Sequence, residues 1–342
     1  MKFSALPVLL ITLMSASSLN AQPVRAIPSP RRPVHTFSIV ARDPVTGEMG
    51  VAVQSHWFSV GSMVTWAEPG VGAIATQSFV EPSYGPLGLD LMRSGKSATE
   101  ALKALLTGDS NPAVRQVAMV DARGNIAAHT GEKCIVAAGH ETGEQFSAEA
   151  NLMANERVWP AMAKAFRETK GDLAERMLAA LDAGQAAGGD IRGKQSAAIL
   201  IVSAKKTGKP WEETLFNLRV DDHAEPLKEL RRLVRLQRAY NHMNAGDLAS
   251  EKNDTVGMLR EYGAAEALAP ENLEMIYWHA VALVNIGKVD ESLPLFKKVF
   301  AGDPNWAILT PRLVKSELLP ADPKIMERIL AQSSAQAPAK KK

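Results

Sequence analysis

Hydrophobic residues near residue 36 form two short runs on either side of a turn. Residues 36–42 and 49–55 are rich in apolar side chains, and the segment between them carries Pro44 and Gly47. Apolar runs bounded by such turn residues are typical of β-strands. The pattern therefore predicts a hairpin, and it places the hydroxyl residue Thr36 at the start of its first strand.

Farther along the chain, short apolar runs alternate with segments that have helical spacing. Hairpins come first and last, and two consecutive helices come late, which favours an α+β fold over a regular βαβ alternation. We expect helices stacked on a mainly antiparallel double sheet. The predicted strands cover 71–76, 116–121, 125–130 and 197–202, and the predicted helices cover 97–106, 151–166 and 172–183. Ser97 and Glu100 have the spacing of a capping box at the first of these helices.

Beyond about residue 226 the apolar positions lie three or four residues apart, which predicts a second, helical domain over residues 226–330. Pro270 and Pro304 are 34 residues apart, as are Tyr262 and Phe296, and this is the period of a tetratricopeptide repeat. Two units rarely stand alone, so we expect the region to lean on the first domain through the helix that begins near residue 227. It would either bind a protein partner or serve as a helical cap or dimer contact.

The N-terminus has the features of an export signal over residues 1–21, with Lys2 followed by a short apolar core and small residues up to Ala21. Residues 22–35 contain four prolines and three arginines, which predicts an extended, mobile arm. The domain that carries the double sheet would then cover 36–225, and a disordered tail would cover 331–342. The protein is expected to be exported, to the periplasm or outside the cell.

Composition narrows the classes of function. Lys and Arg total 39 against 37 Asp and Glu, so the formal charge of +2 gives no reason to expect nucleic acid or an anionic membrane as a partner. No later apolar stretch is long enough to span a bilayer. The single cysteine, Cys134, excludes an intrachain disulfide, and its apolar, strand-like surroundings indicate a buried filler.

Thr36 is the candidate nucleophile, because a Thr, Ser or Cys at the start of a buried strand is how an N-terminal nucleophile hydrolase begins. In such an enzyme the free α-amine of that residue acts as the base. Here residues 22–35 precede Thr36, so the amine would be free only after a cut between His35 and Thr36. The alternative is that Thr36 simply begins a strand, as β-branched residues often do.

An acyl-transfer site also needs hydrogen-bond donors for the developing oxyanion. Polar residues at the ends of predicted strands are the candidates for this role or for substrate binding, although each could instead satisfy loop backbone or cap the following helix. They are Gln54, Ser55, Thr76, Gln77 and Asn151. His56 is expected to be a hydrogen-bonded core residue, with a place in a pocket as the alternative.

Metal and cofactor motifs are absent from the sequence. His129, His140 and His223 have no metal-ligand spacing, and there is no cysteine pair and no phosphate-binding glycine motif. We therefore expect neither a metal site nor a cofactor. The glycine-rich segment 188–194 reads as a loop that could border the pocket. The core strands also lack the buried Lys and Asp that lower the pKa of the nucleophile in proteasome subunits.

Several stretches resemble a bacterial family of unknown function, DUF1028, that is grouped with the N-terminal nucleophile hydrolases. The resemblance covers residues 36 to about 230 and implies a four-layer α-β-β-α sandwich. Members commonly begin with Met directly before the equivalent of Thr36, whereas this chain has a signal and an arm there. The matching stretches are 36–43, 53–55, 70–77, 84–88, 129–131, 134–139, 151–153, 195–196 and 220–223.

Two hypotheses about function follow. In the first, the protein is an exported amidohydrolase that acts on a small amide or peptide-like substrate, with Thr36 as nucleophile and base; His129, in one of the matching stretches, joins the candidates for substrate binding. In the second, the protein is a non-catalytic exported binding or scaffold protein that holds a partner through residues 226–330. The first is the leading hypothesis, and it is supported by the resemblance together with the position of Thr36 at the start of the first strand. The arm and the missing Lys and Asp pair support the second.

Overall fold

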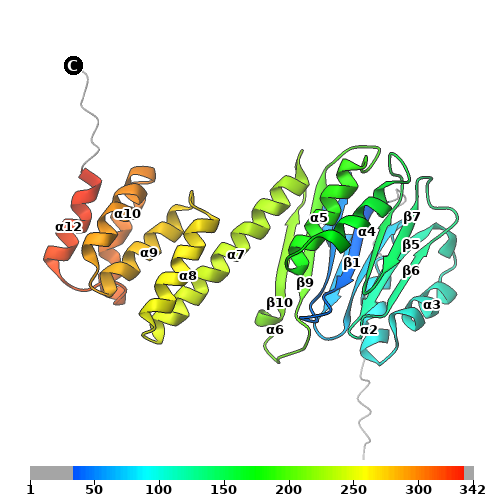
Figure 1. Ribbon diagram of the computed structural model, residues 1–342, viewed down its shortest axis with the longest axis horizontal. Coiled ribbons are helices and arrows are strands. Elements are labelled where there is room, and N and C mark those ends of the chain that lie inside the picture. The colour runs from blue at the N-terminus through cyan, green and yellow to red at the C-terminus, as the bar shows by residue number, and fades with distance from the viewer. Residues whose placement is uncertain (1–33, 335–342) are drawn as a thin grey trace, which may run out of the picture.

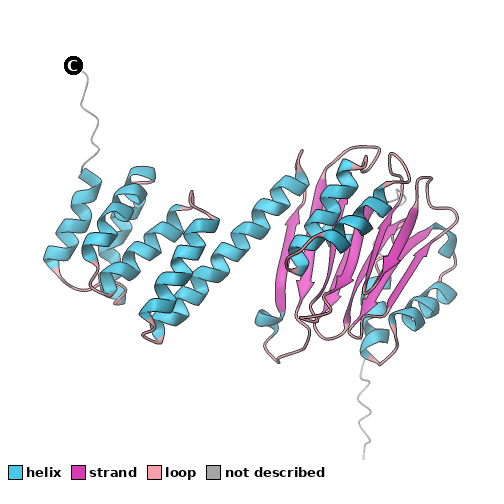
Figure 2. Ribbon diagram, viewed as in Figure 1, coloured by secondary structure: helices cyan, strands magenta, loops and turns pink. Residues whose placement is uncertain are grey.

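The computed structural model describes residues 34–334, which form a mixed α/β domain with two antiparallel sheets and a helical C-terminal region (Figures 1 and 2). The expected signal over residues 1–21 lies outside the described residues. So do residues 22–33 of the expected arm and residues 335–342 of the expected tail.

The larger sheet has six strands in the order β10-β9-β2-β1-β8-β7. All neighbours in it are antiparallel. Strands β1 and β2 form the hairpin that the sequence predicts, and they occupy the centre of the sheet. The strands are β1 (Thr36–Arg42), β2 (Met49–Ser55), β7 (Gly139–Gly143), β8 (Phe146–Ala150), β9 (Ser196–Val202) and β10 (Thr214–Val220).

The smaller sheet has four antiparallel strands in the order β3-β4-β5-β6. Its strands are β3 (Thr65–Glu68), β4 (Gly72–Ser78), β5 (Arg115–Asp121) and β6 (Ile126–Thr130). The inner faces of the two sheets meet in an apolar layer to which Val40, Val51, Ala75 and Val120 contribute, and all four are fully buried. Because side chains alternate along a strand, the opposite faces are left for helices.

Helices cover the outer faces of both sheets. On the six-stranded sheet, α4 (Val158–Glu168) and α5 (Leu173–Ala186) bury Phe37 and Ile39 of β1 in a second apolar cluster. On the four-stranded sheet, α2 (Tyr84–Arg93) and α3 (Ala98–Gly108) pack over Ile74 and Met119. The capping box of Ser97 and Glu100 is present at α3. Short elements complete the domain: α1 (Gly61–Val64), η1 (Pro112–Val114) and α6 (Pro210–Glu213).

Two local predictions were wrong. The helix expected from residue 151 begins only at Val158, and Asn151 is not its N-cap, because residues 151–157 leave the end of β8 as a loop. The run around Cys134 is also a loop and not a strand, and the cysteine is half-buried there. At Cys134 a short apolar run misled the prediction, because such a run does not by itself specify a strand, and Val136 within it is 83% exposed.

The last two residues of the expected arm belong to the core. Val34 is fully buried and forms an antiparallel bridge to Ser78, the last residue of β4 in the other sheet. His35 is 4% exposed. The chain therefore passes from the smaller sheet to the larger one as it enters β1. The residues on both sides of the His35–Thr36 peptide bond are fixed in the core.

The helical region begins with the long helix α7, which packs against β9 and β10 through Leu227, Leu230 and Val234. Arg231 also reaches Glu175 of α5 at 2.7 Å. The predicted contact with the first domain is therefore present, and α12 extends four residues past the expected end of the region. The helices are α7 (Pro226–Glu251), α8 (Thr255–Leu268), α9 (Leu273–Asn285), α10 (Val289–Gly302), α11 (Asn305–Leu309), η2 (Thr310–Ser316) and α12 (Pro323–Ser334).

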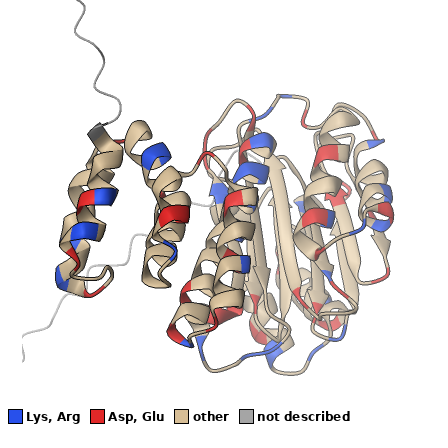
Figure 3. Ribbon diagram, turned by 60° about the vertical axis from the view of Figure 1, so that its left-hand side comes forward, with Lys and Arg blue, Asp and Glu red and all other residues tan. Residues whose placement is uncertain are grey.

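Charged residues lie mostly on the helices and loops, while the strands are largely uncharged (Figure 3). Within residues 34–334, no helix has both the length and the apolar character needed to cross a lipid bilayer.

Candidate active site

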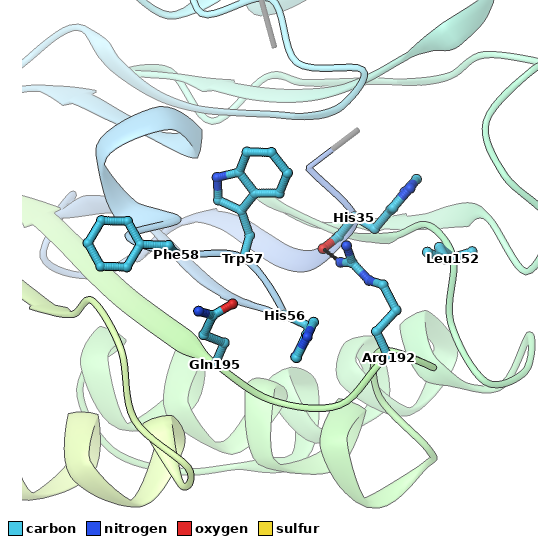
Figure 4. Close-up of a pocket in the computed structure, with 7 residues that line it drawn as sticks. All are labelled: His35, His56, Trp57, Phe58, Leu152, Arg192 and Gln195. Carbon is cyan, nitrogen blue, oxygen red and sulfur yellow. Dashed lines mark hydrogen bonds between the residues drawn. The ribbon is translucent and has the colours of Figure 1, made fainter. Parts of the chain in front are cut away.

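A pocket of about 580 Å³ opens beside the entry to β1 (Figure 4). It lies where β1 begins and β2 ends, because antiparallel pairing places Thr36 opposite Ser55. Two loops close its other sides, one after β8 and one before β9. The lining residues are His35, His56, Trp57, Phe58, Leu152, Arg192 and Gln195.

The carbonyl oxygen of His35, which belongs to the peptide bond joined to Thr36, accepts two hydrogen bonds. One comes from the Ser55 hydroxyl at the end of β2. The other comes from Nη2 of Arg192 at 2.8 Å, and Figure 4 shows the guanidinium reaching across the pocket to this oxygen. Two donors that converge on one carbonyl polarise it, and they would also stabilise negative charge on that oxygen.

Arg192 is held in place by Asp190, whose side chain is fully buried. Its Nη2 lies 2.7 Å from Oδ2 of Asp190 and its Nε lies 3.0 Å from Oδ1, which is the fork geometry of a bidentate pair. Asp190 also accepts a backbone hydrogen bond from His56 at 3.1 Å. Gly193 follows with φ +116°, a backbone conformation that favours glycine. The loop thus presents the guanidinium in one orientation.

Thr36 is fully buried at the start of β1. Its hydroxyl donates to the carbonyl oxygen of Val34 at 3.0 Å. Its own carbonyl oxygen accepts from the backbone N–H of Asn151 at 3.1 Å and from Nε2 of Gln77 at 3.4 Å. In the intact chain its nitrogen is an amide, so it has no basic lone pair.

A chain of side-chain amides lies between the sheets behind Thr36. Nε2 of Gln116 donates to the backbone carbonyls of Ala150, at 2.8 Å, and Gly139, at 3.2 Å. Its Oε1 accepts from Nδ2 of Asn151 and from Nε2 of Gln77, both at 2.7 Å. Because a backbone carbonyl can only accept, the orientation of Gln116 is fixed, and it fixes the other two amides in turn.

The chain of hydrogen bonds ends on a buried carboxyl group. Oε1 of Gln77 accepts the one proton of the Ser38 hydroxyl at 2.8 Å. Ser38 also lies 3.2 Å from Oε1 of Glu149, and with its proton already used it can only accept there. Glu149 must then carry a proton itself. Complete burial raises the pKa of Glu149 well above its usual value, which agrees with a neutral carboxyl group.

Four of the residues predicted from the sequence come together around this point: Thr36, Ser55, Gln77 and Asn151. Three do not. The amide of Gln54 is buried on the helix-covered face of β2 and has no hydrogen-bond partner within residues 34–334. Thr76 donates to the carbonyl of Glu81 at 3.3 Å on the outer face of β4. His129 is hydrogen-bonded to the carbonyl of Pro112 at 2.9 Å, away from the pocket.

His56 is exposed on the pocket wall and is not a core residue, so that expectation was wrong. No group of three or more His, Cys, Asp or Glu side chains in the part of the chain that the structure describes is placed to hold a metal ion.

The model of a family of unknown function, DUF1028, matches residues 36–230. The match covers more than half of the chain. The protein belongs to the DUF1028 family. The matched range begins at Thr36, directly after the His35–Thr36 peptide bond, and it ends within α7, so most of the helical region lies outside it.

A crystal structure of a DUF1028 protein from Silicibacter pomeroyi is similar to this chain, with 31% sequence identity and a TM-score of 0.53. The alignment covers 59% of this chain and 88% of that chain. No curated protein is similar to the chain.

Sequence reasoning missed several residues of the site in this DUF1028 domain. Arg192 lies in the glycine-rich loop that was expected to border the pocket, but no signal pointed to its side chain. His35 was visible only as the neighbour of Thr36. Glu149 is a lone carboxyl residue in the apolar strand β8, and that conflict with its surroundings was the one available clue. Asp190 and Gln116 had no distinguishing pattern.

Proposed function

We propose that this protein is an N-terminal nucleophile amidohydrolase that becomes active by cleaving its own His35–Thr36 bond. The observation that carries the proposal is the His35 carbonyl, which is hydrogen-bonded by Ser55 and Arg192 directly beside the Thr36 hydroxyl. The start of the DUF1028 match at Thr36 supports it. So does the layering of helices on two face-to-face antiparallel sheets, which agrees with the four-layer sandwich of these hydrolases.

The cleavage step uses groups already in place. Oγ1 of Thr36 attacks the carbonyl carbon of His35, and the negative charge that develops on the oxygen is stabilised by Ser55 and Arg192. The C–N bond breaks, the proton of the hydroxyl ends on the freed amine of Thr36, and an ester joins His35 to Oγ1. Water then hydrolyses the ester, which leaves a carboxylate on His35 and restores the Thr36 hydroxyl.

Catalysis on a substrate would repeat these steps. The freed amine has an ordinary pKa of roughly 7.7–8.0, which suits a general base near neutral pH. Ser55 and Arg192 lie outside the segment that is released, so they remain as donors for the substrate carbonyl. Asn151 and Gln77 hold the Thr36 carbonyl and thereby keep the nucleophile in position. The proteasome-type Lys and Asp pair is replaced here by a neutral amide network.

We further propose that the protein is exported and that the helical region is tetratricopeptide-like and binds a protein partner. Gly287 takes φ +79° between α9 and α10, and Ser292 and Phe296 are fully buried, as the repeat requires. A pocket of about 400 Å³ is lined there by Tyr262 and Trp278, among others. If the His35–Thr36 bond stays intact, this region would carry the function, and the protein would be a binding protein.

Hydrolysis by a chain that starts at Thr36 tests the enzymatic proposal. Such a chain can be released from a cleavable fusion and offered a panel of N-acyl amides. We expect turnover that is abolished in Thr36→Ala. Full activity in Thr36→Ala, or no hydrolysis of any amide by the chain that starts at Thr36, would contradict the proposal.

A further inference from the structure

We infer that this site prefers a substrate whose acyl residue, the one that contributes the cleaved carbonyl, has an uncharged side chain that donates a hydrogen bond to Oδ1 of Asn151. The inference rests on the proposed function and names its substrate class. It predicts an amide in which the cleaved carbonyl belongs to a histidine, an asparagine or a residue of similar shape with an N–H donor.

His35 occupies the position that a substrate would take. It supplies the carbonyl that Ser55 and Arg192 hold, and its side chain lines the pocket. Once the bond is cut and the segment leaves, the acyl residue of a substrate must place its own carbonyl on the same two donors. Its side chain then enters the space that the imidazole leaves.

The contact that reads this side chain is the hydrogen bond between Nδ1 of His35 and Oδ1 of Asn151, 2.9 Å long and buried. Asn151 cannot turn its amide around, because its Nδ2 donates to Oε1 of Gln116, whose orientation two backbone carbonyls fix. Its Oδ1 therefore only accepts. The His35 imidazole must carry its proton on Nδ1, and any replacement must also offer a donor there.

Charge further restricts which acyl side chains this position can accept. Burial is the largest cause that lowers the pKa of His35, and Arg192 lowers it as well, while the hydrogen bond to Asn151 and the charge of Asp190 raise it. The net direction is downward, so this position disfavours a cationic side chain. A carboxylate would face the lone pairs of Oδ1. An apolar side chain would leave that oxygen buried without a donor, which we expect to slow turnover by about 10- to 100-fold.

The test compares acetylated aminocoumarin amides of histidine, asparagine, leucine and lysine, with the chain that starts at Thr36 as the enzyme. We expect kcat/KM to be about 10- to 100-fold higher for histidine and asparagine than for leucine and lysine. Leucine hydrolysed as fast as histidine would overturn the inference and leave the proposed function standing.

If no amide is hydrolysed, a binding measurement distinguishes the inferred side-chain preference from the proposed hydrolase function. N-acetyl-histidine amide and N-acetyl-leucine amide are titrated against the same chain, with calorimetry as the readout. Preferential binding of the histidine compound would support the inference although the proposed function had failed. Equal binding, or no binding of either compound, would overturn the inference as well.

The intact chain offers a matched pair of variants. Asparagine carries its Nδ2 at the same bond separation from Cα as Nδ1 of histidine, so His35→Asn keeps the donor. His35→Leu has a similar size and lacks it. Self-cleavage should proceed in His35→Asn and slow by about tenfold or more in His35→Leu. Equal rates in the two variants would mean that the hydrogen bond to Oδ1 of Asn151 does not select the residue at this position.

Discussion

Nη2 of Arg192 lies 2.8 Å from the carbonyl oxygen of His35, although 157 positions separate the two residues in the chain. The guanidinium also forms a bidentate pair with the buried carboxylate of Asp190. A cation fixed in this way is already oriented toward the oxygen before charge develops on it, so little reorganisation is needed during the reaction. This relationship makes the bond before Thr36 different from an ordinary peptide bond in the core.

The first prediction concerns Arg192. Arg192→Lys keeps the charge and loses the fork that Asp190 holds, so self-cleavage should slow by about tenfold or more. The rate is read from intact mass over time. Arg176→Lys is the matched control, because Arg176 pairs with Asp43 at 3.3 Å, away from the pocket. A rate in Arg192→Lys equal to that of the control would show that the guanidinium contributes nothing to the step.

The second prediction concerns Ser55. Ser55→Ala removes one of the two donors to the His35 carbonyl, and loss of one oxyanion donor typically costs about 100- to 1000-fold in rate. Ser147→Ala provides the control, since the Ser147 hydroxyl is equally buried and has no partner among the described residues. We expect Ser147→Ala to cleave at the wild-type rate. Equal self-cleavage rates in Ser55→Ala and Ser147→Ala would contradict the proposed role of the Ser55 hydroxyl.

The third prediction concerns Glu149 and pH. In the unfolded chain this carboxyl loses its proton near an ordinary pKa, whereas burial raises its pKa in the fold. Folding therefore takes up a proton above about pH 4.3, and the free energy of unfolding should fall as pH rises from there. Glu149→Gln needs no proton and can donate to Ser38 through its amide.

We expect Glu149→Gln to be more stable than wild type at pH 7 and to show a flatter stability profile between pH 5 and pH 8, measured by urea unfolding. At pH 4 the two proteins should differ least. A variant that is less stable than wild type at pH 7 would mean that Glu149 is charged in the fold.

The fourth prediction concerns the contact between α7 and the six-stranded sheet. Leu230 is fully buried in the cluster that includes Ile199 of β9. Leu230→Ala should lower the free energy of unfolding by about 2–5 kcal/mol. Leu248→Ala on the same helix is the control, because Leu248 is 53% exposed, and its effect should stay within about 0.5 kcal/mol. Equal stabilities would mean that α7 is not anchored through this cluster.

Local patterns were enough to predict the first hairpin, the capping box of α3 and the change to helices after residue 226. The alternation of side chains along a strand also shows which of the candidate site residues can face the pocket side of the sheets. Of the adjacent pairs Gln54 and Ser55, and Thr76 and Gln77, only one member can face the space between the sheets. Thr36 and Ser55 lie on the inner face of the six-stranded sheet, and Gln77 lies on the inner face of the four-stranded sheet opposite it. Period-two reasoning would therefore have removed Gln54 and Thr76.

The rest depends on contacts that no local pattern encodes. Arg192, which Asp190 orients, reaches the His35 carbonyl only because β9 pairs with β2. Asn151 looked like a helix cap from its neighbours, yet it completes the ladder beside Thr36, because β8 pairs with β1. The burial of Val34 and His35 was also hidden, because the prolines and arginines before them suggested a mobile segment.

The most direct test of the central claim is the N-terminus of the purified protein. The full chain from residue 1 is expressed, incubated near pH 8 and analysed by intact mass and N-terminal sequencing, with Thr36→Ser and Thr36→Ala in parallel. We predict that the wild type and Thr36→Ser come to begin at residue 36, while Thr36→Ala keeps the bond to His35. A wild-type chain that retains the His35–Thr36 bond, or a Thr36→Ala chain that is cut equally well, would contradict the account.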